Sequence, residues 1–169
     1  NFSGIKDEDI ASINFHGRRV SLFSHSFLGH GANEILKKFQ DKNACFATGY
    51  VLPSSLAAIG DGRLCGREIF ESINQDNSIS DTVIPATENN PSSAWYTVGA
   101  ASTISQKTPL AFTDNFTAET LLERADSTYC KQDWESQKLN YVDDDYLNQN
   151  CLVSSLFYSL SVYGYGIPA

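Results

Sequence analysis

Residues 23–39 read FSHSFLGHGANEILKKF and join two kinds of predicted structure. The residues just before the first glycine continue an alternating, strand-like pattern. Gly29 and Gly31 then punctuate a turn, after which Ile35 and Phe39 recur at helical spacing. A strand–turn–helix junction brings backbone N–H groups to one point, where small anions often bind. The stretch therefore predicts a mixed α/β fold whose first helix directly follows a strand.

The residues upstream of this stretch predict a β-hairpin. Residues 10–15 (IASINF) and 19–25 (RVSLFSH) both alternate between apolar and polar side chains, which is the period of a strand. His16 and Gly17 lie between them and predict a tight turn, because glycine accepts a positive φ.

Downstream of the hairpin, apolar residues recur mainly at helical spacing. The expected helices cover residues 68–73, 94–104, a segment that starts at Phe116 and Thr117, 130–139, and a last helix that Gly164 and Gly166 end. Residues 94–104 are apolar and small and fit either a strand or a buried helix, of which we favour the helix. Their expected N-caps are Ser92 or Ser93 for the second, Thr117 for the third and the acidic run 143–145 for the last. Residues 43–66 and 74–93 are rich in turn-forming or polar residues and predict loops.

The composition limits the classes of protein that the chain can belong to. It has 169 residues, 41% of them apolar, which suffices for one domain or for one lobe of a larger protein. Its formal net charge of −8 argues against nucleic acid as a partner, because phosphate binding needs a basic face. No apolar run approaches the ~18–20 residues of a membrane-spanning helix. We therefore expect a single unit over residues 1–169 without a membrane span.

The four cysteines fall into two pairs with similar separations. Cys45 and Cys65 are 20 residues apart, and Cys130 and Cys151 are 21 apart. None belongs to a C-x-x-C motif, so a zinc site or a thioredoxin-like redox site is not indicated. The spacing favours two local disulfides, with four buried free thiols as the alternative. Disulfides would indicate an oxidising compartment, so that the protein would be secreted or periplasmic.

No group of residues in the sequence forms a self-contained catalytic motif. His25 and His30 are five residues apart, which does not match the i, i+4 spacing of two metal ligands on one helix. Ser24 and Ser26 flank His25 without the G-x-S-x-G pattern of a serine hydrolase. The acidic run 143–145 lacks the spacing of a calcium-binding loop. We therefore expect neither a catalytic residue nor a metal ligand in the chain itself.

Two Asn-x-Ser/Thr sequons stand at Asn1 and Asn115. Such a sequon can accept an N-linked glycan on a surface loop of a secreted protein. It carries no such meaning if the source is bacterial.

Six short motifs occur in an order that resembles the apyrase family, the nucleoside triphosphate diphosphohydrolases. They are a hairpin followed by F-S-H-S-F-L-G-H-G at 23–31, N-A-C-F at 43–46, C-K-Q-D-W at 130–134, Y-L-N-Q-N-C at 146–151 and G-Y-G at 164–166. The hairpin is the first of the six, and the five segments after it are similar to the family's Y-x-H-S-F-L-x-x-G, x-P-C-F, C-x-x-x-W, Y-L-x-x-Y-C and G-Y-G segments. The resemblance covers nearly the whole chain, and bacterial members with two disulfides are the most similar.

The resemblance implies an actin-like, two-lobed enzyme built of ribonuclease-H-like halves. Such an enzyme hydrolyses nucleoside tri- and diphosphates to monophosphates and phosphate with Ca²⁺ or Mg²⁺. The chain resembles the second, nucleobase-binding lobe, because the family's glycine-rich phosphate loop, its catalytic Glu and its D-x-G-G loop would precede residue 1. A final Trp-containing signature would follow residue 169. We therefore expect this chain to be inactive alone, with nucleotides and the first lobe as its partners.

The resemblance also implies which residues would touch the nucleoside. Tyr96 and Asn150 match the two positions that sandwich the base, although Asn150 replaces a usual aromatic residue. Tyr146 matches a position that touches the ribose or the base, and His25 and Ser26 would brace the cleft wall. The alternative is a non-catalytic nucleotide-binding or scaffold module that has diverged from apyrases.

Overall fold

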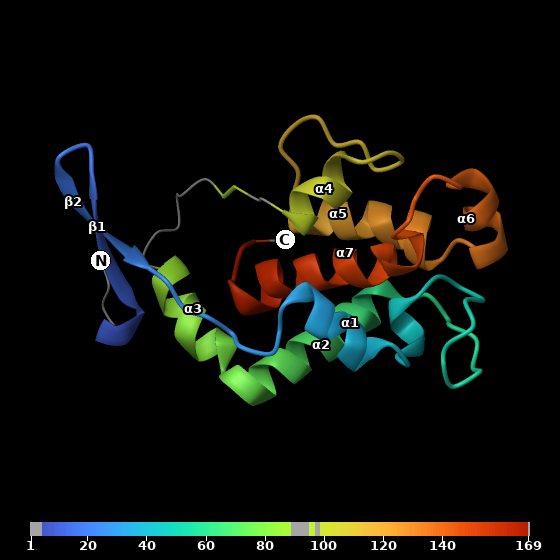
Figure 1. The fold of residues 1–169 in the computed structure, drawn as a ribbon, viewed down its shortest axis with the longest axis horizontal. Coiled ribbons are helices and arrows are strands. Elements are labelled where there is room, and N and C mark those ends of the chain that lie inside the picture. The colour runs from blue at the N-terminus through green and yellow to red at the C-terminus, as the bar shows by residue number, and fades with distance from the viewer. Residues whose placement is uncertain (1–4, 89–94, 97–98, 169) are drawn as a thin grey trace.

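The computed structural model describes residues 5–88, 95–96 and 99–168, and it shows a β-hairpin followed by helices (Figure 1). The strands are β1 (Ile10–Phe15) and β2 (Arg18–Phe23). The helices are α1 (Ala32–Phe39), α2 (Gly62–Asn77), α3 (Ile79–Glu88), α4 (Ala100–Gln106), α5 (Ala118–Ala125), α6 (Trp134–Asn140) and α7 (Asn150–Tyr158). The expected mixed α/β class, with a hairpin ahead of helices, is confirmed at this level. No helix in the described residues is long and apolar enough to cross a membrane.

The hairpin forms as its alternating pattern predicts. β1 and β2 pair antiparallel, with Ile10 opposite Phe23 and Phe15 opposite Arg18. The two residues between them have φ values of 47° at His16 and 75° at Gly17, as a two-residue hairpin turn requires. β2 begins at Arg18 and ends at Phe23, so its bounds differ from the expected 19–25. The hairpin lies at one end of the molecule, beside α3 (Figure 1).

The strand–turn–helix expected from residues 23–39 is present. α1 starts directly after Gly31 and buries Ile35 and Phe39. Lys37 and Lys38 lie in its last turn, where cations interact favourably with the helix dipole.

α2 is longer than the expected helix over residues 68–73, and the loop expected over 43–66 ends earlier. The Asp61 carboxylate accepts a hydrogen bond from the N–H of Leu64 at 2.9 Å and caps the helix at Gly62. The glycines near its start predict a loop, but in the structure the first turns are helical. This helix carries Cys65 into the core, where burial of the side chain stabilises it. Ser78, with a φ of 47°, ends α2.

The polar segment 74–93, expected as a loop, is largely helical where it is described. α2 continues to Asn77, and α3 follows after one residue. Ile79 and Val83 are four residues apart on α3 and are both buried, so they give this helix an apolar face against the core. Residues 89–93 lie outside the described residues.

The next helix is displaced from the expected 94–104. α4 begins only after Gly99, which has a φ of 72°, and it extends to Gln106. The expected N-caps Ser92 and Ser93 lie outside the described residues. The N-cap expected at Thr117 is confirmed, since its hydroxyl accepts the N–H of Thr120 at 3.0 Å.

The last two expected helices differ from the prediction in their starts and in helix type. The helix expected over 130–139 begins only at α6, and the last one runs as a 3-10 turn, α7 and a π-helical turn that ends at Gly164, as expected. α5 continues into a π-helical turn, Asp126–Cys130, and α6 starts only at Trp134, with the Asp133 carboxylate as its cap. The expectation that the acidic run 143–145 caps the last helix is wrong. α7 begins at Asn150 after a 3-10 turn, and Gln149 at its N-cap position makes no side-chain cap.

α7 is the central helix of the molecule and packs against α2, α4 and α5 (Figure 1). Small residues let α2 approach it closely. A Cβ added to Gly66 of α2 would lie 3.3 Å from the carbonyl oxygen of Ser155. The buried hydroxyls of Ser154 and Ser155 donate to carbonyl oxygens of α7 itself at 2.8 Å, so they need no partner on another helix.

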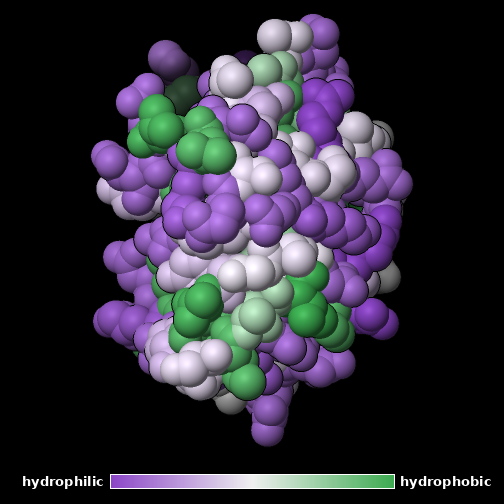
Figure 2. Space-filling model, turned by 90° about the vertical axis from the view of Figure 1, so that its right-hand side faces the viewer, coloured by the Kyte–Doolittle hydropathy of each residue, from purple (hydrophilic) through white to green (hydrophobic). Residues whose placement is uncertain are grey.

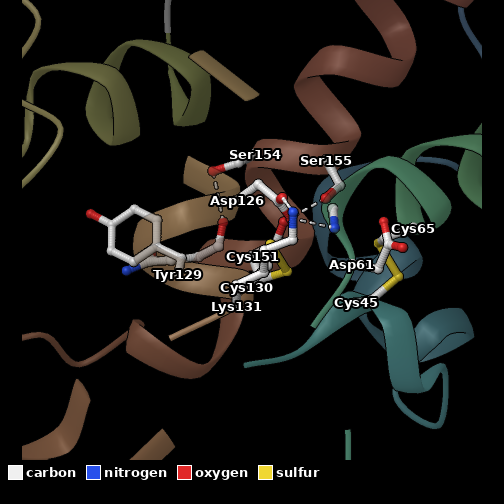
Figure 3. The surroundings of a disulfide bond; sticks show 12 residues. Cys45, Asp61, Cys65, Asp126, Tyr129, Cys130, Lys131, Cys151, Ser154 and Ser155 are labelled. Carbon is white, nitrogen blue, oxygen red and sulfur yellow. Dashed lines mark hydrogen bonds and ion pairs between the residues drawn. A yellow bond between two sulfur atoms is a disulfide. The ribbon is translucent and has the colours of Figure 1, made fainter. Parts of the chain in front are cut away.

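Two disulfides lie near each other beside the start of α2 (Figure 3). Cys45 is bonded to Cys65 of α2, and Cys130 is bonded to Cys151 of α7. The Cys151 sulfur lies 3.8 Å from the carbonyl oxygen of Ala44, next to the other disulfide. The second disulfide therefore joins α7 to the π-helical turn before α6, rather than to α6 itself.

Candidate functional site

The carboxylate of Asp144 organises the segment between α6 and α7. It pairs with the ammonium of Lys107, which directly follows α4. It also accepts the backbone N–H of Tyr146 at 3.0 Å and the side-chain amide of Asn150 at 2.7 Å. Its side chain is only 7% exposed. One carboxylate thus ties α4 to the turn before α7 and to the first residue of α7.

These contacts set the protonation of the site. Burial would raise the pKa of Asp144, but the hydrogen bonds from Lys107, Asn150 and the Tyr146 N–H outweigh it and the pKa is lowered. Burial, with the nearby Asp144 and Tyr141, raises the pKa of the Tyr129 phenol. Asp144 is therefore charged and Tyr129 is neutral at pH 7.

A hollow of about 320 Å³ lies beside this carboxylate. Its aromatic walls are Tyr50, Trp134 and Tyr141, and its polar groups include Lys138, Asp144, Asp145 and Asn148. The Trp134 and Tyr50 rings meet edge to face at 5.0 Å, and the Lys138 ammonium lies 5.9 Å from the Trp134 ring centre. The volume is within the range of small-molecule sites. The three aromatic side chains give the hollow ring faces on which a flat ligand can stack, and its polar groups can bond to the edge of that ligand.

The local sequence explains why these rings meet. The N–H of Trp134 donates to the carbonyl of Thr48 at 2.9 Å, which holds the start of α6 against the segment that carries Tyr50. The buried amide of Gln137 donates to the carbonyls of Tyr129 and Gln132 at 3.0 and 2.8 Å. Together these bonds fix the face of α6 that borders the hollow.

The same end of the molecule exposes apolar side chains (Figure 2). Figure 2 looks onto the end that carries α6 and shows separate green groups among hydrophilic surface. Two segments border the hollow here, the one that follows Tyr50 and the one that contains α6. The first exposes Val51, Leu56 and Ile59, and the second exposes Leu139 and Val142. Exposed apolar side chains therefore lie on both of the segments that supply the aromatic walls of the hollow.

The structure places Tyr146 and Asn150 on the Asp144 network. Tyr146 is 65% exposed, so its ring is available to a ligand. Asn150 is only 5% exposed, and its amide is engaged by Asp144. Its side chain thus supports the segment around Tyr146 and does not present an open face.

Tyr96 is not brought to the other two predicted residues. It is 88% exposed and precedes α4, whereas Lys107, the partner of Asp144, follows α4. Along the chain, Tyr96 and Lys107 are thus separated by α4, which is about 10 Å long. In this structure Tyr96 and Tyr146 offer separate aromatic surfaces.

His25 and Ser26 lie near the base of the hairpin. The Nδ1 atom of His25 is 2.6 Å from the carboxylate of Asp9, whose side chain is 8% exposed. The N–H of Ser24 also donates to the carbonyl of Asp9 at 2.8 Å, and Ser26 is exposed. His25 therefore fastens the end of β2 to the residue just before β1 and braces the hairpin. Its place on the wall of a nucleotide cleft stays a prediction.

Sequence reasoning missed most of the hollow. It assigned no site role to Tyr50, Trp134, Lys138 or Tyr141, although Trp134 closes the C-x-x-x-W motif. Among the described residues, no group of three or more His, Cys, Asp or Glu side chains is arranged to hold a metal ion. The hollow is lined by Asp145 and Leu147, the residues on either side of the predicted Tyr146.

The comparisons with known proteins add no assignment. No protein-family model matches the chain, and no curated protein matches it.

Proposed function

We propose that this chain is the nucleoside-binding lobe of an apyrase-like enzyme that hydrolyses nucleoside tri- and diphosphates to monophosphates. The supporting observation is the aromatic hollow, which lies between two of the six motifs. Trp134 closes the C-x-x-x-W motif, and Asp145 and Leu147 flank Tyr146 of the Y-L motif. A motif order that implies a nucleoside site thus coincides with a hollow suited to a planar ring.

The residues of the hollow offer the contacts that a nucleoside needs. One stack of a base on an aromatic ring is worth about 1–3 kcal/mol. Lys138 supplies hydrogen-bond donors, Asp145 supplies acceptors, and the Asn148 amide supplies both. The exposed ring of Tyr146 stands next to them in sequence. Without contacts to phosphate, we expect an affinity of about 1 mM or weaker.

The phosphate chemistry would lie in another part of the enzyme. In the proposed enzyme the Ca²⁺ or Mg²⁺ would be held by the nucleotide and by the first lobe. We therefore propose that this chain alone is inactive and that its part is to bind and orient the nucleoside. The two disulfides support a secreted or periplasmic enzyme, because they persist in oxidising compartments.

The ribonuclease-H-like architecture is part of the same proposal. The hairpin supports it, because two strands alone are marginally stable and usually belong to a larger sheet. In a complete two-lobed enzyme, further strands would extend this sheet.

An NMR titration of the chain with AMP tests the binding role. Only Trp95 and Trp134 give indole N–H signals, and we expect the Trp134 signal to shift with a millimolar Kd. Tyr146→Ala should weaken this binding severalfold. Phe15→Ala is the matched control, because Phe15 is 60% exposed and lies on the hairpin. An unshifted Trp134 signal at 20-fold the ~1 mM expected Kd would refute the proposal.

A second candidate, a non-catalytic nucleotide-binding or scaffold module, is favoured by Asn150. The position matches an aromatic residue in apyrases, yet here its side chain is buried and bonded to Asp144. Measurement of phosphate release from ATP by the complete protein separates the two. Nucleotide binding without phosphate release supports the module, and release by the 169-residue chain alone contradicts its proposed inactivity.

A further inference from the structure

We propose that a second hollow, between α5 and the loop that joins α4 to α5, binds a free amino acid with an apolar side chain. Its volume is about 490 Å³, and it is lined by residues 111–117 of the loop and by Thr120 and Arg124 of α5 (Figure 1). Ligand sites begin at about 300 Å³. It shares no residue with the hollow beside Asp144, so the inference is independent of nucleotide binding.

Arg124 gives this hollow a fixed positive group. Its guanidinium lies 4.0 Å from the centre of the Phe112 ring and donates one hydrogen bond to the carbonyl of Leu110 at 2.9 Å. Within residues 5–88, 95–96 and 99–168, no carboxylate forms an ion pair with it. A guanidinium carries several N–H donors in a planar fork, so most of them remain open. Such a fork binds a carboxylate through two parallel hydrogen bonds.

Asp114 gives the same hollow a negative group. Its carboxylate is exposed, accepts the Thr113 hydroxyl at 3.3 Å through Oδ2, and pairs with no cation of the described residues. The hydroxyls of Thr117 and Thr120 bond to each other at 3.0 Å and are not counted on for a ligand. The Oδ1 atom of Asp114 and the exposed amide of Asn115 are left to accept the N–H groups of an ammonium.

Two phenylalanine rings form the apolar wall of the hollow. The ring centres of Phe112 and Phe116 are 4.7 Å apart, and the planes are tilted by 37°. Both residues are partly buried and pack on the core cluster that contains Leu110 and Leu121. The core therefore holds the two rings in place while part of each stays open to the hollow. An apolar side chain that leaves water against these rings gains free energy.

The loop is fastened to the end of α4 in a strained conformation. The N–H groups of Ala111 and Phe112 donate to the carbonyls of Lys107 and Ser105, both at 2.8 Å. Ala111 has a φ of 43°, a region that favours glycine. Backbone strain at a non-glycine residue occurs often at binding sites. The wall that carries Phe112 is thus held in one position before a ligand arrives.

An unpaired cation, an unpaired anion and an apolar wall together match one class of small molecule. The α-carboxylate of an amino acid would bind Arg124, its α-ammonium would bind Asp114, and its side chain would lie on the phenylalanine rings. A simple anion would be repelled by Asp114, and an uncharged apolar ligand would leave both charges unused. The zwitterion uses all three features at once.

An NMR titration of the ¹⁵N-labelled chain with L-phenylalanine tests the site. We expect the Arg124 Nε–H and Asn115 amide signals to shift with a Kd of about 1 mM. Three related ligands each lack one feature: N-acetyl-L-phenylalanine lacks the ammonium, L-phenylalaninamide lacks the carboxylate and glycine lacks the side chain. Each should bind about fivefold more weakly or worse. Signals that do not shift at 20-fold the ~1 mM expected Kd, or derivatives that bind as tightly as L-phenylalanine, would overturn the proposal.

Two substitutions assign the charged contacts. Asp114→Asn should weaken binding of L-phenylalanine about fivefold and leave that of N-acetyl-L-phenylalanine unchanged. Arg124→Gln should weaken binding of N-acetyl-L-phenylalanine and leave that of L-phenylalaninamide unchanged. The Tm of each variant is measured first, and because Asp114 is exposed on a loop, its variant keeps the test decisive if Arg124→Gln unfolds.

Asp143→Asn is the matched control. Asp143 is also an exposed aspartate, and it lines neither hollow. We expect this variant to bind L-phenylalanine as the unchanged chain does. Equal weakening by Asp143→Asn and Asp114→Asn would trace the effect to net charge and would refute the site.

Discussion

The carboxylate of Asp126 accepts the N–H of Gly62 at 2.8 Å, across 64 residues of chain and in the buried space between the two disulfides (Figure 3). Gly62 is the first residue of α2, so its N–H has no partner within the helix. Asp126 also pairs with the exposed ammonium of Lys131 at 2.5 Å. One carboxylate therefore closes the N-terminus of α2 from a segment that is distant in sequence.

Replacing Asp126 should destabilise the fold by leaving that N–H without an acceptor. We expect Asp126→Ala to lower the free energy of unfolding by about 1–3 kcal/mol in urea denaturation. Lys131→Ala is the control, since it removes only the solvent-exposed partner and should have a smaller effect. Equal losses in the two variants would show that the Gly62 bond adds nothing.

Gly60 should tolerate no side chain. Its φ is 63°, and an added Cβ would lie 2.0 Å from the carbonyl oxygen of Cys130, which is far inside contact distance. We expect Gly60→Ala to cost at least about 2 kcal/mol of stability, measured by urea denaturation. Gly29→Ala separates the two causes, because Gly29 has a φ of 79° with no atom within 4 Å. A similar loss in both variants would attribute the effect to backbone conformation alone.

Each disulfide should contribute strongly to stability. The loops that they close span 20 and 21 residues, for which the chain-entropy model gives roughly 3 kcal/mol each. We expect Cys45→Ala with Cys65→Ala to lower the stability by about this amount in chemical denaturation. A thiol assay on the unfolded, unreduced protein should find no free thiol, and four thiols per chain would contradict both cross-links.

The Asp144 network should make the stability of the fold vary with pH in the acidic range. Its pKa is lower in the folded protein than the ~3.9 of an unperturbed Asp, so its contribution is complete above that value. The contribution is lost as the pH falls from about 4 toward the lowered pKa. We therefore expect Asp144→Asn to destabilise the protein at pH 6 and much less at pH 2.5. Tm measured at both pH values checks this, and an unchanged difference would exclude Asp144 as the titrating group.

The hairpin was predictable because its signals are local. Alternating side chains give the strands, and Gly17 gives the turn, without help from distant residues. α2 and α3 were misjudged because their polar and glycine-rich stretches resemble loops. Asp61 as a cap and the burial of Cys65 and Ile79 decide the helical structure instead. These depend on the packed core, which a local pattern does not contain.

The candidate site was only partly predictable for the same reason. Tyr146 could be proposed from its motif, because the whole motif lies in one short segment. The hollow could not, since Tyr50 reaches Trp134 only through the hydrogen bond that joins Thr48 to α6. The burial of Asn150 likewise follows from Asp144 and Lys107, which come together only when α4 packs on α7.

The close contact of Gly66 with Ser155 also limits how the molecule can move. The backbones of α2 and α7 meet there with no side chain between them, and a disulfide fastens each helix to a neighbouring segment. Sliding one helix along the other would drive backbone atoms together. The α2–α7 pair is therefore held as one packed unit at this contact.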